Sequence, residues 1–100
     1  MVPVFFEAEV FAAVRGLIRR RAIDPDQGRQ ALFVLGQIKV RRAAITPLIA
    51  EAFAIRDRFG PYDVFYAIVA RLSEATLLTC DRGLARAANG YCKVEYVPLS

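Results

Sequence analysis

Residues 64–72 are apolar at every position except Arg71, and this stretch limits the folds that the chain can adopt. A helix that is apolar nearly all round must be covered nearly all round, so we expect it to lie at the centre of the protein. The short apolar run of residues 75–80 follows it and contains two β-branched threonines. This run predicts a strand that is covered on both faces.

Helical and strand patterns alternate along the rest of the chain. The expected helices cover residues 3–21, 25–36, 46–55, 61–72 and 81–88, and the expected strands cover residues 40–45, 75–80 and 92–97. Strands that alternate with helices favour an α/β fold of packed layers with parallel strands. Helices outnumber strands in this pattern, which suggests that part of a complete domain is missing.

Capping signals support the first two helices. Pro3 suits a first helical position, because proline lacks the N–H that a helix start leaves unpaired. Asp24 followed by Pro25 is typical of a helix start. We expect the buried face of the helix over residues 25–36 to consist of Ala31, Leu32, Val34 and Leu35.

The composition excludes several kinds of chemistry. The chain contains no histidine, so Ser–His and Cys–His mechanisms are excluded. It also has no P-loop and no Gly-rich dinucleotide turn. Cys80 and Cys92 are too few and too far apart for a zinc site, and we expect both to be buried as small hydrophobic residues. Any catalysis must therefore depend on carboxylates.

The length and the net charge of the chain constrain its function less than the absence of histidine does. One hundred residues correspond to one domain. No apolar run reaches the roughly 18–20 residues of a membrane span, so the expected location is the cytoplasm. Twelve of the 14 cations are arginine and the net charge is +4. Arginine binds phosphate through two parallel hydrogen bonds, so this excess of positive charge is compatible with binding to nucleic acid.

Three acidic residues lie in or beside apolar segments, where a charged side chain is unusual. Glu9 interrupts the apolar helix pattern of residues 3–21, Asp63 stands in the first turn of the apolar helix, and Asp81 follows the strand of residues 75–80. Each also has a structural interpretation, as a half-exposed glutamate, a carboxylate stabilised by the helix dipole, and an N-cap. Thr79 would add a hydroxyl beside Asp81, because α/β folds place ligand sites at the carboxyl ends of parallel strands.

The segments around these acids resemble a known family. Glu9 opens a small apolar helical run that ends in Arg15, residues 62–70 read YDVFYAIVA, and residues 75–85 read ATLLTCDRGLA. Together these segments resemble PIN-domain ribonucleases of the VapC toxin type, in matching order along nearly all of the chain. The second and third segments carry most of the resemblance.

The resemblance implies a PIN-like three-layer α/β fold and a metal-dependent endoribonuclease that acts as the toxin of a toxin–antitoxin pair. By the same resemblance, Glu9, Asp63 and Asp81 would be catalytic and would hold Mg²⁺ or Mn²⁺, with Thr79 in support. Mg²⁺ prefers carboxylate oxygens and retained waters, so this chemistry needs no histidine. The implied partners are the RNA substrate, a cognate antitoxin and a second copy of the chain.

The sequence departs from the family pattern at its start. Family members begin with a strand that ends in aspartate, then a helix and a second strand, and Val2-Pro3 falls where that second strand should finish. A strand–helix–strand unit takes about 30 residues. We therefore expect residues 1–100 to form a single partial PIN domain that lacks the central first strand. Such a chain either cleaves RNA with three acids or is a non-catalytic remnant that binds an antitoxin or dimerises.

Two surface features complete these expectations. RNA phosphates would bind Arg15, Arg19, Arg20, Arg21, Arg41 and Arg42, although a solvated arginine face explains the same residues. The apolar helix surface could receive an antitoxin segment or a second copy, or could be packed in the core; its phenylalanines are Phe5, Phe6, Phe11, Phe33 and Phe53. An unrelated small α/β protein with capped helices remains a third reading of the whole chain.

Overall fold

The computed structural model describes residues 1–98, which form two compact units. We call residues 4–41 the hairpin unit, because it consists of two packed helices. We call residues 1–3 and 42–98 the sheet unit, because it contains all the strands of the described chain. None of the helices within residues 1–98 is long and apolar enough to cross a membrane.

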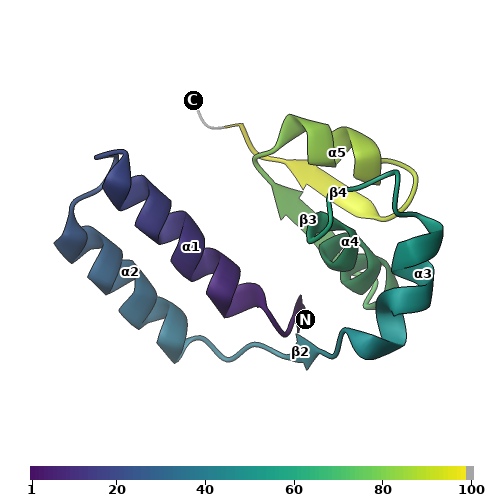
Figure 1. Cartoon of the computed structure of the whole chain (residues 1–100), viewed down its shortest axis with the longest axis horizontal. Coiled ribbons are helices and arrows are strands. Elements are labelled where there is room, and N and C mark those ends of the chain that lie inside the picture. Colours follow the sequence, from purple (N-terminus) through teal and green to yellow (C-terminus); the bar gives the residue numbers. More distant parts are fainter. Residues whose placement is uncertain (99–100) are drawn as a thin grey trace. The chain divides into compact units, whose positions relative to one another are not determined.

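The hairpin unit consists of α1 (Phe6–Arg19) and α2 (Pro25–Gln37) (Figure 1). The predicted start of α2 is confirmed. The Asp24 carboxylate accepts a hydrogen bond from the Gln27 N–H at 2.8 Å, and the Gln27 side chain accepts one from the Asp24 N–H at 2.9 Å. This reciprocal capping box satisfies two backbone donors that a helix start leaves unpaired.

Gly28 sets the contact between the two helices. A Cβ atom at this position would lie 2.6 Å from Ile18 Cδ1 and 3.1 Å from Val14 Cγ1. The buried face of α2 is therefore centred on Gly28, with Leu32 and Leu35 half-buried one and two turns later. The prediction that Val34 and Ala31 belong to it is wrong, because both are exposed and lie beside this stripe.

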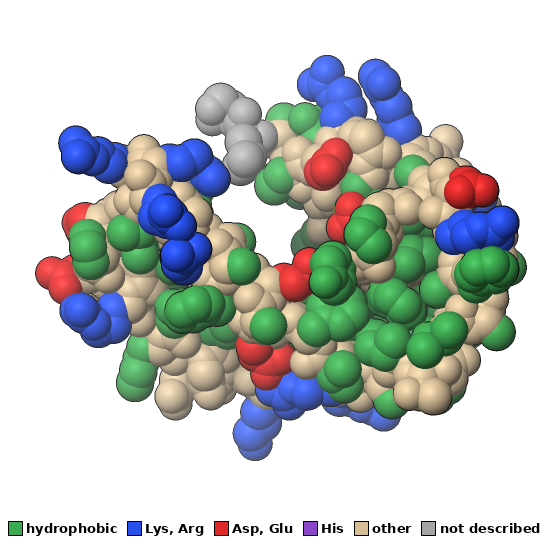
Figure 2. Space-filling model, in the orientation of Figure 1, with side chains coloured by type: hydrophobic (Ala, Val, Ile, Leu, Met, Phe, Trp, Pro, Cys, Tyr) green, Lys and Arg blue, Asp and Glu red, His purple; other side chains and the backbone are tan. Residues whose placement is uncertain are grey.

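Most cations of the hairpin unit lie near the connection between its helices, whereas Lys39 and Arg41 follow the end of α2. Figure 2 shows Lys and Arg side chains in blue at this end, where α1 finishes. Four of the predicted arginines lie on or just after α1, and all of them are exposed: Arg15, Arg19, Arg20 and Arg21. Phe11 and Phe33 are also exposed, so core packing does not explain these two phenylalanines.

The sheet unit contains two short parallel sheets. Its elements are β1 (Val2–Pro3), β2 (Arg42–Ala43), a 3₁₀ turn (Thr46–Leu48), α3 (Ile49–Ala54), α4 (Asp63–Leu72), β3 (Thr76–Thr79), α5 (Arg82–Ala88) and β4 (Lys93–Tyr96). One sheet pairs β1 with β2, and the other pairs β3 with β4. The expected α/β class with parallel strands is confirmed, whereas the three-layer arrangement stays a prediction.

Pro3 corrects one prediction. It does not begin a helix but pairs with Ala43 in β1, and its side chain is fully buried. Strand β1 contacts α4, so tertiary packing outweighs the preference of proline for a helix start. Strand β2 is also shorter than the predicted strand of residues 40–45, and the exposed Arg42 forms half of it.

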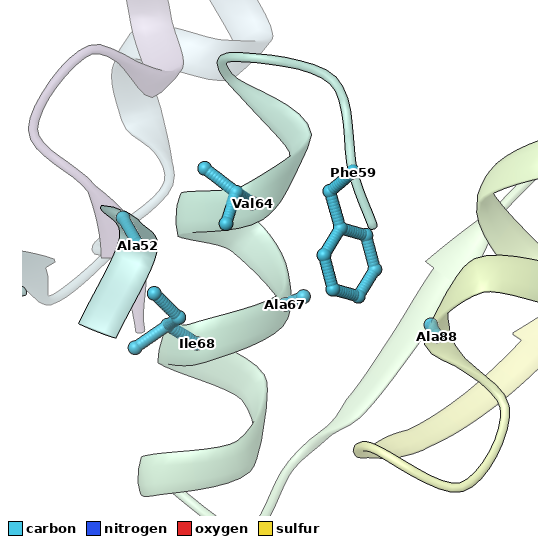
Figure 3. Close-up of a cluster of buried hydrophobic side chains, with 6 residues drawn as sticks. All are labelled: Ala52, Phe59, Val64, Ala67, Ile68 and Ala88. Atoms are coloured by element: carbon cyan, nitrogen blue, oxygen red, sulfur yellow. The ribbon is translucent and has the colours of Figure 1, made fainter. Parts of the chain in front are cut away.

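Helix α4 is central to the sheet unit, as predicted. Five of its ten residues are buried, and it contacts α3, β1 and β3. Figure 3 shows Ile68 pointing toward Ala52 of α3 and Ala67 pointing toward Phe59. Ala67 and Ile68 have no exposed surface, and with Val64 they form the α4 part of the core. Removing the side chain of a residue such as Ile68 would cost about 2–5 kcal/mol.

The strand β3 is covered on one face only. Leu77 packs with Val94 of β4 against the core, but Leu78 is 64% exposed on the other face. The prediction of a strand covered on both faces is therefore wrong for the described chain. Cys80, just after β3, is exposed and corrects the expectation of a buried residue, while Cys92 is half-buried.

Candidate active site

Asp81 lies two residues after the last residue of β3, at the carboxyl end of a parallel strand pair. Its Oδ1 accepts a hydrogen bond from the Leu84 N–H at 3.1 Å, so it caps α5 as the structural interpretation predicted. Thr79 Oγ1 in turn accepts a hydrogen bond from the Asp81 N–H at 3.0 Å. A carboxylate has about four lone-pair positions, so one cap bond leaves Asp81 able to bind a further group. The side chain is exposed.

Gly83 leaves room for this carboxylate. A Cβ atom at Gly83 would lie 3.2 Å from Asp81 Oδ1, which is a closer approach than most side chains tolerate. Any larger residue here would therefore push the carboxylate away from its present position. Asp81 is held from two sides, by Thr79 before it and by the first turn of α5 after it.

Tyr96 and Arg82 lie at the same strand ends as Asp81. Tyr96 pairs with Thr79 in the β3–β4 register, and the Val97 N–H donates to the Thr79 carbonyl at 2.8 Å. The Arg82 guanidinium lies over the Tyr96 ring, 5.5 Å from its centroid. Sequence reasoning missed both residues. The adjacency of Arg82 to Asp81 was visible, but the approach of Tyr96 depends on the strand register.

Asp63 is the first residue of α4 and is half-buried. A Cβ atom at Gly60 would lie 3.5 Å from Asp63 Oδ2, so the carboxylate lies close to the loop before the helix. The positive end of the helix dipole favours a negative charge at this position. The dipole thus favours a carboxylate at this position, next to the buried Val64.

Glu9 belongs to α1 of the hairpin unit. Its Oε1 atom is buried and has no hydrogen-bond partner. A buried carboxylate oxygen without a partner is costly, unless it binds a cation or carries a proton. Glu9 as a whole is half-exposed, as the structural interpretation predicted, and only its Oε1 atom is shielded from water.

The donor chemistry of these acids matches a hard cation. Asp63, Asp81 and Glu9 offer carboxylate oxygens, and Mg²⁺ and Mn²⁺ prefer such ligands. Within residues 1–98, no three His, Cys, Asp or Glu side chains gather closely enough to hold a metal ion. Asp63 and Asp81 belong to the sheet unit and Glu9 to the hairpin unit. A site of three acids stays a prediction.

Comparison with known proteins gives several curated relatives from Mycobacterium tuberculosis. Over 97 residues the chain is 27% identical to ribonuclease VapC9, covering 97% of this chain and 76% of that protein. It is 35% identical to ribonuclease VapC3 over 85 residues, covering 85% of this chain and 62% of the relative. It is 31% identical to ribonuclease VapC1 over 96 residues, covering 95% of this chain and 72% of the relative. No family model and no solved structure matches the chain.

Proposed function

Since this chain belongs to the family of VapC ribonucleases, we propose that it is a metal-dependent endoribonuclease and the toxin of a toxin–antitoxin pair. The observation that carries the proposal is the position of Asp81. It is an exposed carboxylate at the carboxyl end of the parallel β3–β4 pair. Ligand sites of α/β folds lie at such strand ends.

Asp63, Asp81 and Glu9 are the residues that would hold Mg²⁺ or Mn²⁺. A bound divalent ion would supply positive charge to the phosphate and lower the pKa of a water molecule. The chain itself positions Asp81 through Thr79 and through the α5 cap. Because the chain has no histidine, its carboxylates are the candidate general bases.

The partners proposed are RNA, an antitoxin and a second copy of the chain. An antitoxin's amphipathic segment would fit an apolar groove of about 340 Å³ in the sheet unit. Its walls come from α3, α4 and the loop between them, and include Phe53, Phe59 and Phe65. Phe53 is 65% exposed there, which leaves a large apolar side chain for a partner. A single PIN-like domain of three layers remains part of this proposal.

A non-catalytic remnant is the second candidate function. It is favoured by the apolar groove of α3 and α4, whose lining includes none of the three acids. Such a remnant would keep the apolar groove and bind an antitoxin, but it would not cleave RNA. The two candidate functions differ in one measurable activity, the cleavage of RNA.

Cleavage of a mixed RNA pool by the 100-residue chain, with Mg²⁺ and with chelator, tests the proposal. The Asp81→Asn variant is the sharpest probe, because asparagine caps a helix as well as aspartate but carries no charge. Asp63→Asn is the second probe, and Asp57→Asn, at an exposed acid between α3 and α4, is the matched control. Activity that requires Mg²⁺ and both Asp63 and Asp81, but not Asp57, supports the nuclease. A folded chain without activity supports the remnant.

A further inference from the structure

The arginines of the sheet unit differ in how their donors are used. Arg71 donates to both carboxylate oxygens of Glu51, and Arg58 donates to the carbonyls of Ala87 and Asn89. Arg56 donates to the carbonyl of Phe53. Within residues 1–98, Arg82 and Arg86 have no carboxylate or carbonyl partner, and Arg82 differs from Arg86 in that its guanidinium lies over an aromatic ring, that of Tyr96. The N–H donors of Arg82 are therefore open to an outside acceptor.

Helix stability does not explain an arginine at this position. Arg82 is the first residue of α5. The amino end of a helix is its positive end, where a cation is unfavourable and an anion is favourable. Arg82 is also next to Asp81, yet it lies over Tyr96 instead of pairing with that carboxylate. The position thus favours a function outside the helix over a structural one.

Stacking prepares the guanidinium for a phosphate. A guanidinium over an aromatic ring loses some of its side-chain freedom before a ligand arrives. Its in-plane N–H groups remain able to form two parallel hydrogen bonds, which match the oxygens of a phosphodiester. Tyr96 is half-buried and fixed by the β4 ladder, so it provides a rigid platform.

The location links this arginine to the proposed site. Tyr96 pairs with Thr79, and Thr79 accepts a hydrogen bond from the Asp81 N–H. Asp81, Arg82 and Tyr96 therefore lie together at the carboxyl ends of β3 and β4. The negative charge of Asp81 alone would repel RNA, and an adjacent cation offsets this repulsion.

We infer that Arg82 binds a phosphate of the RNA strand beside Asp81 and that Tyr96 is the positioning residue for its guanidinium. The inference rests on the proposed function for its choice of ligand, and it adds a substrate contact to that site. The contact would be to the backbone, so it would position RNA without selecting its sequence.

Binding of a labelled single-stranded RNA of mixed sequence, in chelator and at several salt concentrations, tests this inference. Chelator prevents metal-dependent cleavage, so binding is measured whether or not the chain is a nuclease. The Arg82→Gln variant keeps part of the alkyl chain over the ring and loses the charge. We expect it to weaken binding about tenfold and to reduce the slope of log K against log salt by about 0.7.

Lys93→Ala is the matched control. Lys93 is exposed in the same strand as Tyr96 but pairs with Thr76, at the opposite end of the β3–β4 ladder. This variant also loses one positive charge. We expect its RNA affinity to stay within about twofold of that of the unchanged chain, because salt screens the attraction between Lys93 and a phosphate bound at the other end of the ladder. Tyr96→Leu should weaken binding while the salt slope stays nearly unchanged, because Arg82 is still present. Thermal unfolding of each variant verifies that the chain is folded.

The outcomes separate this inference from the proposed function. Equal losses for Arg82→Gln and Lys93→Ala, no loss for Arg82→Gln, or no RNA binding by the folded chain would each overturn the inference. RNA that binds through Arg82 but is never cleaved in Mg²⁺ would support the phosphate contact and refute the nuclease. Cleavage with an unchanged KM in Arg82→Gln would refute the contact and leave the nuclease standing. If Arg82→Gln fails to fold, Arg82→Lys tests the same contact, since it keeps the charge and loses the planar fork.

Discussion

Arg71 and Glu51 join α4 to α3 through a two-point contact. Arg71 Nη2 donates to Glu51 Oε2 at 2.6 Å and to Oε1 at 2.5 Å, and the Tyr91 hydroxyl donates to Oε1 at 3.0 Å. The Arg71 guanidinium also lies 5.1 Å from the centroid of the Tyr91 ring. Three segments that are distant in sequence therefore meet at one carboxylate.

Glu51→Ala should destabilise the chain by about 1 kcal/mol, at the upper end of the range for partly exposed ion pairs, because it removes several contacts at once. Asp26→Ala is the control, since the Asp26–Arg29 pair is single and its side chains are 91% and 76% exposed, against 36% and 38% for Glu51 and Arg71. We expect Asp26→Ala to cost less than about 0.5 kcal/mol. Urea unfolding measures both. Equal losses of unfolding free energy in the two variants would contradict a larger contribution from the contacts of Glu51 with Arg71 and Tyr91.

The Tyr91 hydroxyl makes the unfolding free energy depend on pH in the alkaline range. Burial raises the pKa of Tyr91 above its usual value of 10.0; Arg71 lowers it, and the hydrogen bond to Glu51 raises it. A group whose pKa is raised by folding stabilises the folded state below its unfolded pKa, and this contribution is lost as pH rises through the folded pKa. The unfolding free energy of the chain should exceed that of Tyr91→Phe near neutral pH, and the difference should shrink above about pH 10. A difference that is constant from about pH 8 to about pH 11.5 would contradict the prediction.

Gly28→Ala should destabilise the hairpin unit. The new methyl group would lie 2.6 Å from Ile18 Cδ1, so the side chains between the helices must shift, at a cost of about 1–3 kcal/mol. Alanine recovers up to about 1 kcal/mol through its higher helix propensity. Gly36→Ala in the same helix is the control, because nothing lies within 4 Å of its added Cβ, and it should be neutral or stabilising. Chemical unfolding followed by circular dichroism compares the two, and equal stability of both variants would argue against the close contact.

Gly83→Ala should separate cleavage from stability. The added Cβ would lie 3.2 Å from Asp81 Oδ1 and displace the carboxylate by a few tenths of an ångström. Alanine improves helix propensity in α5, so the unfolding free energy should change by less than about 1 kcal/mol. RNA cleavage should fall by about tenfold or more, because catalysis depends on the position of the reacting groups. Cleavage at the original rate would indicate that the position of Asp81 is not critical.

Features that depend on neighbouring residues in the sequence were predictable. The start of α2 follows from Asp24-Pro25, and the central place of α4 follows from its apolar composition. The α5 cap also follows from one residue, Asp81. In each case the determining interaction is local or depends only on composition, so a single sequence is sufficient.

Features that depend on distant segments were not predictable in this way. Pro3 joined a strand because β2 and α4 lie beside it, and Leu78 is exposed because β3 is covered on one face only. The Arg82–Tyr96 contact requires the register of β3 against β4. The resemblance did place Val2-Pro3 at the end of a strand, which helical periodicity alone did not. The metal-binding roles of Glu9, Asp63 and Asp81 stay predictions.

The sheet unit is discontinuous in sequence, because β1 precedes the hairpin unit and its partner β2 follows it. During synthesis, Val2 and Pro3 leave the ribosome before Arg42 and Ala43 have been made. Strand β1 therefore cannot pair with β2 until all of residues 4–41 have been translated. The helices α1 and α2 have no such delay, since their contacts lie within one continuous segment. The contacts of the hairpin unit can therefore form on the nascent chain before the β1–β2 pair can.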